Sequence, residues 1–251
     1  MRSRILVLLL ILSVNISVNA QPKVIAHRGF WNTEGSAQNS LRSLIKADSI
    51  GCFGSEFDIW ITADGKVMVN HDGVYEGKVI ETSKYSELKD LKLNNGEKLP
   101  TLESYLRQAR KLKVNLILEV KQHKSLSRQN LAIDKALSLV KKMKLTHRMI
   151  YISFSIDAVK RLIAKAPHGT EVYYLGGDKT PSELKAMGCS GPDYYAGTLK
   201  AHLDWIEESH KLGMKVNVWT VDDAKDLKYF IDKDADFITT NNPTLLQELL
   251  Q

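Results

Sequence analysis

The sequence contains only two cysteines, Cys52 and Cys189, and this scarcity limits its chemistry. Metal sites built on cysteine need several thiols or imidazoles at short, regular spacing, whereas these two residues lie far apart. Each follows a glycine, Gly51 or Gly188, at the expected end of a helix. We therefore expect two unpaired, buried thiols, although an oxidising compartment would permit a disulfide between them.

The sequence also lacks an arginine-rich tract, which argues against a nucleic-acid partner. Without Arg2 and Arg4, the 35 basic residues become 33, which against 29 acidic residues leave a net charge of +4. The surplus is spread along expected helices such as residues 135–144. A mild positive charge suits a small anionic substrate, and we expect no nucleic-acid binding.

Long apolar runs are absent, because the most apolar stretch, residues 5–12, is too short to span a bilayer. It follows Arg2 and Arg4 and precedes the small-residue sequence Val18-Asn19-Ala20. This order is typical of a secretory signal peptide. We expect residues 1–20 to be removed and residues 21–251 to be exported, to the periplasm or the medium, without stable insertion in a membrane.

No internal repeat, low-complexity stretch or interdomain linker interrupts the remaining residues, which predicts one domain. Strands and helices alternate eight times, and this alternation predicts a TIM-type (β/α)8 barrel. The expected strands are residues 23–27, 54–61, 115–121, 149–154, 171–175, 194–197, 215–220 and 236–240. The expected helices are residues 39–50, 101–112, 126–144, 156–165, 181–187, 202–212, 223–233 and 243–250, and Asn39 and Asn242 are expected to cap the first and the last.

A small insertion is expected after the second strand, at residues 64–99. The Asp64-Gly65 pair predicts a hairpin from that strand into residues 67–70. The rest of the segment is polar and is expected to extend over the C-terminal face of the barrel.

Ionisable residues stand at the carboxyl ends of successive expected strands. Buried strands rarely carry such groups unless they are paired or bind a metal. Glu56 and Asp58 lie two residues apart and therefore share one face, as do Glu119 and Lys121. The two remaining strand ends carry His27 and His71.

The three carboxylates Glu56, Asp58 and Glu119 predict a site for one divalent cation. Oxygen ligands favour a hard ion, Ca²⁺ or Mg²⁺, over zinc. Without an ion, mutual repulsion would raise the pKa values of these groups. The alternative is a set of ion pairs with Lys121 and Arg28.

The order of these motifs resembles the glycerophosphodiester phosphodiesterase family. The motifs are His27-Arg28-Gly29, Glu56-Phe57-Asp58, His71-Asp72, Glu119-Val120-Lys121, Leu99-Pro100-Thr101-Leu102-Glu103, Ser153-Phe154-Ser155 and Val218-Trp219-Thr220-Val221. The resemblance extends from about residue 23 to the C-terminus. It implies metal-dependent hydrolysis of small glycerophosphodiesters to glycerol 3-phosphate and an alcohol, with the same three carboxylates as ligands.

Two histidines titrating near neutrality, His27 and His71, are the acid–base candidates, and the sequence does not assign the two roles. Arg28 and Lys121 are expected to bind the phosphate. Phe154 and Trp219 either wall the glycerol side of the pocket or pack the top of the barrel. The nucleophile is a glycerol hydroxyl, giving a cyclic phosphate, or water. No partner or role is expected for the other histidines, His123, His147, His168, His202 and His210.

The sequence departs from the family pattern at three places, which concern substrate recognition and the metal affinity or histidine pKa of the site. Gln38 and Asn241 stand where the family often has acidic residues, and residues 74–77 replace a usual arginine-threonine-threonine stretch. Two other functions stay open. One is a lysophospholipase D or sphingomyelinase D-like activity on lipids, against which the polar insertion argues. The other is a barrel that binds phosphodiesters without catalysis. The sequence defines neither the preferred head group nor the oligomeric state.

Overall fold

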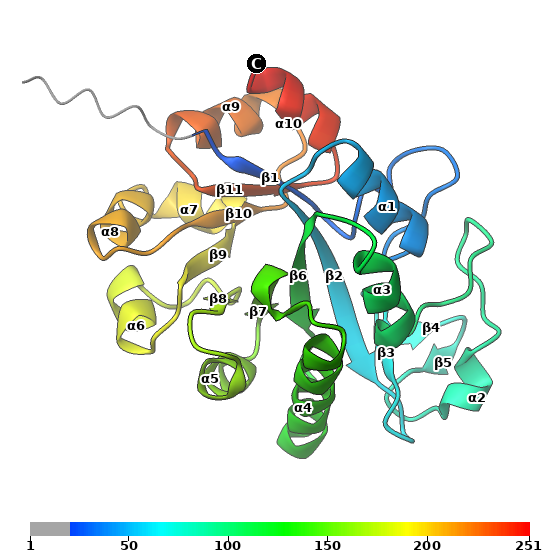
Figure 1. Cartoon of the computed structure of the whole chain (residues 1–251). Coiled ribbons are helices and arrows are strands. Elements are labelled where there is room, and N and C mark those ends of the chain that lie inside the picture. Colours follow the sequence, from blue (N-terminus) through cyan, green and yellow to red (C-terminus); the bar gives the residue numbers. More distant parts are fainter. Residues whose placement is uncertain (1–20) are drawn as a thin grey trace, which may run out of the picture.

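The computed structural model describes residues 21–251, so the expected signal peptide lies outside the described residues. Within this range, eight parallel strands form a closed ring in the order β1-β11-β10-β9-β8-β7-β6-β2, and β1 pairs with β2 to complete it. Helices surround the strands (Figure 1). The predicted TIM barrel is thus confirmed. No helix of residues 21–251 is both long and apolar enough to cross a membrane.

The barrel strands and the surrounding helices follow the predicted alternation closely. The strands are β1 (Lys23–Ala26), β2 (Gly54–Ile61), β6 (Asn115–Val120), β7 (Met149–Ser153), β8 (Glu171–Tyr174), β9 (Gly191–Tyr195), β10 (Asn217–Trp219) and β11 (Phe237–Thr240). The helices are α1 (Leu41–Ser49), α3 (Leu102–Ala109), α4 (Leu126–Lys142), α5 (Ile156–Lys165), α6 (Pro181–Ala186), α7 (Ala196–Ala201), α8 (Trp205–Lys211), α9 (Ala224–Asp232) and α10 (Pro243–Leu249), with a short 3₁₀ turn at Thr146–Arg148.

The sixth barrel strand was predicted too late in the sequence. It begins at Gly191, where the chain packs so closely against β10 that a side chain would collide with the Lys215 carbonyl. The residues predicted to end this strand instead begin α7, a helix that the pattern did not predict. Glycine and proline at 191 and 192 read as a turn in sequence, whereas here the glycine permits a close backbone approach.

The insertion after β2 forms a small packed lobe. The predicted hairpin is confirmed, since β3 (Val67–Val69) pairs antiparallel with β2. The short strands β4 (Val74–Tyr75) and β5 (Lys78–Val79) and helix α2 (Tyr85–Leu88) follow, and they lie outside the helical ring beside α3 (Figure 1). Its buried apolar residues are Met68, Ile80, Leu88, Leu93 and Leu99. The segment therefore has its own core, although its surface is polar.

Alternation along the strands separates two cores. Phe57 and Ile59 point outward and pack in the layer beneath the helices. Inward-facing residues fill the barrel itself, and they are Ile25, Ile117, Ile150, Ile152, Tyr173, Leu175 and Phe237. Glu119 lies two residues after the interior residue Ile117 on β6, so it faces the carboxyl end of the barrel, where Asp58 of β2 is its register partner.

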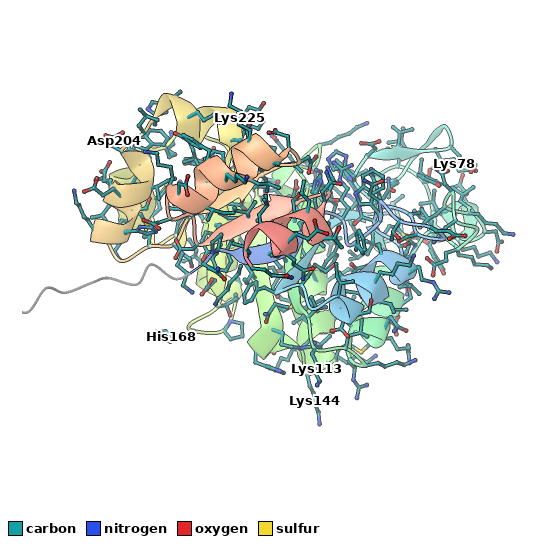
Figure 2. All side chains as sticks on the ribbon, turned by 90° about the horizontal axis from the view of Figure 1, so that it is seen from above. Lys78, Lys113, Lys144, His168, Asp204 and Lys225 are labelled. Atoms are coloured by element: carbon teal, nitrogen blue, oxygen red, sulfur yellow. The ribbon has the colours of Figure 1, made fainter. Side chains whose placement is uncertain are left out.

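Cys52 and Cys189 are both free and buried, as expected. Burial raises the pKa of the Cys52 thiol to about 12 and that of Cys189 to about 11, so neither forms a thiolate readily. The basic surplus is dispersed: Lys78, Lys113 and Lys225 lie on different sides of the molecule (Figure 2).

The two ends of the described chain meet. Strand β1 pairs along its whole length with β11, and the Gln21 side chain donates a 2.6 Å hydrogen bond to the Leu250 carbonyl. Ring closure therefore joins the first strand to the last.

Candidate active site

A cavity of about 140 Å³ opens at the carboxyl ends of the barrel strands, and seven of the nine predicted site residues line it: His27, Arg28, Glu56, His71, Glu119, Phe154 and Trp219. The other two, Asp58 and Lys121, contact Glu119. Lys121 Nζ lies 2.9 Å from Glu119 Oε1 and 3.3 Å from Asp58 Oδ1. The structure thus brings all nine residues together.

The three carboxylates form a compact, buried cluster. Asp58 and Glu119 are register partners on β2 and β6, and Glu56 lies two residues before Asp58. One oxygen of each lies within 4.8 Å of the others, and the three residues are 1–7 % exposed. Oxygens that each lie about 2.4 Å from a shared Ca²⁺ are at most about 4.8 Å apart, so the cluster can share one ion.

Charge is divided unevenly within the cluster. Burial, Asp58 and Glu119 raise the pKa of Glu56 well above its usual range. Burial and Asp58 raise the pKa of Glu119 to about 8, although Lys121 opposes this. Burial also acts to raise the pKa of Asp58, but Lys121 and other cations outweigh it and keep that pKa low. Glu56 Oε1 is buried and accepts no hydrogen bond from the described residues. An unpartnered oxygen in a cluster where two carboxyl groups have raised pKa values fits a cation site.

Asn39 holds the side chain of Asp58, and its predicted capping role is wrong. Ser40 caps α1, because its extended backbone suits that position whereas Asn39 has a left-handed φ of 59°. The Asn39 side chain is 1 % exposed. Its Nδ2 donates to Asp58 Oδ2 over 2.8 Å, and its Oδ1 accepts from the Asp58 backbone N–H over 3.1 Å. This two-point contact fixes the carboxylate.

The turn after β1 aims Arg28 at the cluster. Arg28 and Gly29 both have left-handed backbones, with φ of 56° and 74°, and a side chain at Gly29 would collide with Ser43. The turn lets the Arg28 backbone N–H donate to Glu56 Oε2 over 2.8 Å. The guanidinium donates to Gln38 Oε1 over 2.6 Å, while its buried Nε has no partner among the described residues.

His27 is oriented by an amide rather than by a carboxylate. Trp31 Nε1, which can only donate, lies 2.9 Å from Asn241 Oδ1, and Asn241 Nδ2 donates to Asp222 over 2.8 Å. Asn241 Oδ1 is therefore an acceptor, so His27 Nδ1, at 2.9 Å, carries the proton and Nε2 is the free nitrogen. Burial and then Arg28 lower the pKa of His27 to about 4.

His71 lies in a different environment. Its Nδ1 is 2.7 Å from Asp72 Oδ1, and its side chain is 37 % exposed. A carboxylate partner stabilises a positively charged imidazole, which an amide does far less well. The two histidines are therefore inequivalent: His27 pairs with an amide and has a lowered pKa, whereas His71 pairs with a carboxylate.

Phe154 and Trp219 combine their two predicted roles, cavity wall and barrel packing, and Lys121 forms the ion pairs expected as its alternative role. Phe154 and Trp219 pack edge to face, with centroids 5.5 Å apart, and both line the cavity. Phe154 nevertheless stays 41 % exposed. Lys121 forms ion pairs with Glu119 and Asp58, not with Glu56.

Three further residues of the site had no signal in the sequence. His123 was expected to lack partners, yet its Nδ1 donates to the Lys121 carbonyl over 2.7 Å and its Nε2 accepts from Ile61 N–H over 3.2 Å. Asp222 fixes the amide of Asn241. Asp193 on β9 is 1 % exposed, lines the cavity, and has its pKa raised by burial to about 7.

Two other histidines also have partners that were not expected. His202 stacks on Trp205 with centroids 3.9 Å apart, and His210 Nε2 lies 2.8 Å from Asp236 Oδ2. Both lie on the α7–α8 side of the barrel and do not line the cavity.

Comparisons with known proteins agree with this geometry. The sequence profile of the glycerophosphoryl diester phosphodiesterase family matches residues 27–245. A glycerophosphodiester phosphodiesterase from Parabacteroides distasonis is 51 % identical, with a TM-score of 0.90 over 92 % of this chain and 97 % of that one. A glycerophosphodiester phosphodiesterase from Caldanaerobacter subterraneus subsp. tengcongensis is 25 % identical over 91 % of this chain and 97 % of its own length.

A more distant structure shares the fold. It is a phosphodiesterase from Oleispira antarctica in complex with its product sn-glycerol-3-phosphate, 21 % identical, with a TM-score of 0.78 over 92 % of this chain and 97 % of that one. The family profile covers most of the barrel and includes every strand end that carries a site residue. The chain therefore belongs to the glycerophosphoryl diester phosphodiesterase family.

Proposed function

We propose that this site hydrolyses glycerophosphodiesters to glycerol 3-phosphate and an alcohol, using one divalent cation, with His27 as base and His71 as acid. The observation that carries the proposal is one cavity lined by His27, His71, Glu56 and Glu119, with Asp58 in the same carboxylate cluster. The product complex of the Oleispira antarctica phosphodiesterase, which has the same fold, supports glycerol 3-phosphate as the product.

Glu56, Asp58 and Glu119 would hold the cation, Ca²⁺ or Mg²⁺, in this proposal. When bound, it would act as a Lewis acid toward the phosphate and would orient the substrate. Asn39 and Lys121 keep Asp58 and Glu119 in place. The donor set consists of oxygen alone, which suits either ion and disfavours zinc.

Arg28 would provide the main contact to the phosphate. Its Nε has no partner among residues 21–251 and its planar fork matches two phosphate oxygens. Lys121 is 13 % exposed and already engaged with two carboxylates, so its charge would act mainly on the cluster.

The two histidines would divide the proton transfers according to their partners. His27, neutral with Nε2 free, would take a proton from the attacking hydroxyl or water. His71, paired with Asp72, would give a proton to the departing alkoxide.

The proposal is tested with the purified chain and glycerophosphocholine, in chelator and after addition of Ca²⁺ or Mg²⁺. We expect chelation to abolish release of glycerol 3-phosphate and one of the ions to restore it. The variants Glu56→Gln, Asp58→Asn and Glu119→Gln should each lose activity lastingly. Undiminished turnover in chelator, with all three carboxylates replaced, would contradict the metal assignment.

A further inference from the structure

A second, larger cavity adjoins the first, and His71 lines both. It has a volume of about 660 Å³ and lies between the loop after β1 and the insertion after β2. Residues 31–39 form one wall, and residues 70–75 with 93–94 form the other. His27 lines only the first cavity, so the two cavities meet at the histidine that we propose as the acid.

Amide and aliphatic hydroxyl side chains make up seven of the fourteen residues that line this second cavity. These residues are Asn32, Thr33, Ser36, Gln38, Asn39, Asn70 and Asn94. The rest of the lining has no lysine or arginine and consists of Trp31, Glu34, Ala37, His71, Asp72, Tyr75 and Leu93. Each amide offers a donor and an acceptor, the combination that hydroxyl groups require.

Several of these polar groups are left unused by the protein. Asn70 is 8 % exposed; its Nδ2 donates to the Asp72 carbonyl over 2.8 Å, while its Oδ1 has no partner among the described residues. Gln38 accepts from Arg28 through Oε1, which leaves its Nε2 free. Asn94 makes no side-chain hydrogen bond within residues 21–251 and is exposed.

We infer that this cavity binds the alcohol part of the substrate and selects polyhydroxylated head groups such as inositol, glycerol or a sugar. The inference rests on the proposed function, because a head group must leave from the side of the acid, His71. Amides with free donors and acceptors pair with neighbouring hydroxyls. A quaternary ammonium instead needs several aromatic faces around it. Here the lining has two aromatic residues among many amides.

The experiment compares kcat/KM for four glycerophosphodiesters that carry inositol, glycerol, choline or methyl as the alcohol. The methyl diester reports the reaction without a head group long enough to fill the second cavity. We expect the inositol and glycerol diesters to exceed the choline diester by about 10-fold. Asn94→Ala and Asn70→Ala should each lower the ratio of inositol to methyl kcat/KM about 5-fold or more.

Gln108→Ala is the matched control, because Gln108 lies on α3 and does not line either cavity. It should leave that ratio unchanged. Equal kcat/KM for the inositol and choline diesters, or unchanged ratios in both asparagine variants, would overturn the inference while the proposed function stands. Absence of cleavage of all four diesters with Ca²⁺ or Mg²⁺ would overturn both. Exposure of Asn94 keeps that variant informative if Asn70→Ala fails to fold.

Discussion

At the residue scale, the base role proposed for His27 and the acid role proposed for His71 predict different responses to the leaving group. An alkoxide must be protonated as it departs, whereas p-nitrophenolate departs without a proton. We expect His27→Ala to lower kcat by about 10²-fold for both the methyl and the p-nitrophenyl diester of glycerol phosphate. His71→Ala should lose about as much on the methyl diester but far less on the p-nitrophenyl diester. Steady-state kinetics of both variants measure this, and the opposite pattern would exchange the two roles.

The amide of Asn241 lies directly against His27 Nδ1, which gives a second prediction. Asn241→Asp would place a carboxylate beside His27 Nδ1, and an adjacent negative charge favours the protonated imidazole. The pKa of His27, now about 4, should rise, so the acidic limb of the kcat/KM–pH profile should move to higher pH. Asn242→Asp is the control, since the Asn242 side chain contacts Asp222 and not His27. A limb that stays in place in Asn241→Asp would exclude His27 as the base.

The sequence was sufficient to find the residues at strand ends but not those that support them. Period-two spacing put Glu56 and Asp58 on one face, and parallel strands bring their carboxyl ends together. Asn39, Asp222 and His123 make contacts with residues that are distant in the chain, so no local pattern shows them. Asn39 was predicted to cap a helix because a short amide side chain can serve either as a cap or, as here, as the hydrogen-bond partner of a carboxylate.

At the scale of elements, the alternation of strands and helices predicted the barrel, and the errors arose where tertiary contacts override local pattern. The interior of the insertion could not be predicted, because its apolar residues are spaced irregularly and form a cluster separate from the main core. Strand β9 begins at Gly191, where glycine is needed because the backbone of Lys215 lies too close for a side chain.

This close approach at β9 can be tested by substitution. Gly191→Ala should lower the free energy of unfolding by about 2–4 kcal/mol, since its Cβ would collide with the backbone of Lys215. Gly169→Ala is the control, because its left-handed φ of 83° adds strain while no atom lies within 4 Å of the new Cβ. That variant should lose only about 1 kcal/mol. Urea unfolding measures both, and equal losses would contradict the steric argument.

At the scale of the whole molecule, the carboxylate cluster couples stability to pH and to the cation. The pKa of Glu119 is about 8 in the folded protein and near 4.5 when the chain is unfolded. Below pH 4.5 both states are protonated; between pH 4.5 and 8 only the unfolded state ionises, so the free energy of unfolding falls as the pH rises. A cation binds the ionised carboxylates, so Ca²⁺ should raise Tm more at pH 8 than at pH 6.5.

Thermal unfolding in chelator and in Ca²⁺ checks this prediction between pH 6.5 and 8. Below pH 6.5 the lowered pKa of His27 acts in the opposite direction: the unfolded state binds the proton more readily, so the free energy of unfolding rises with pH. The raised pKa of Asp193 also makes the free energy of unfolding fall as the pH rises to about 7, but Asp193 lies outside the carboxylate cluster. Glu119→Gln should remove most of the Ca²⁺ response. An equal Ca²⁺ response at both pH values would show that the cluster is already ionised without a metal.

The meeting of β1 with β11 makes the order of the elements around the ring cyclic. Because Gln21 lies against Leu250, a short peptide can connect these two ends without crossing the barrel. Cutting the chain instead at the exposed turn around residues 167–169 would give a circular permutant with every strand pair intact. The neighbours of each catalytic side chain would be unchanged, so the permutant should keep its activity. Its folding would differ, because the most distant strands that must pair to close the ring would be β8 and β7 instead of β1 and β11.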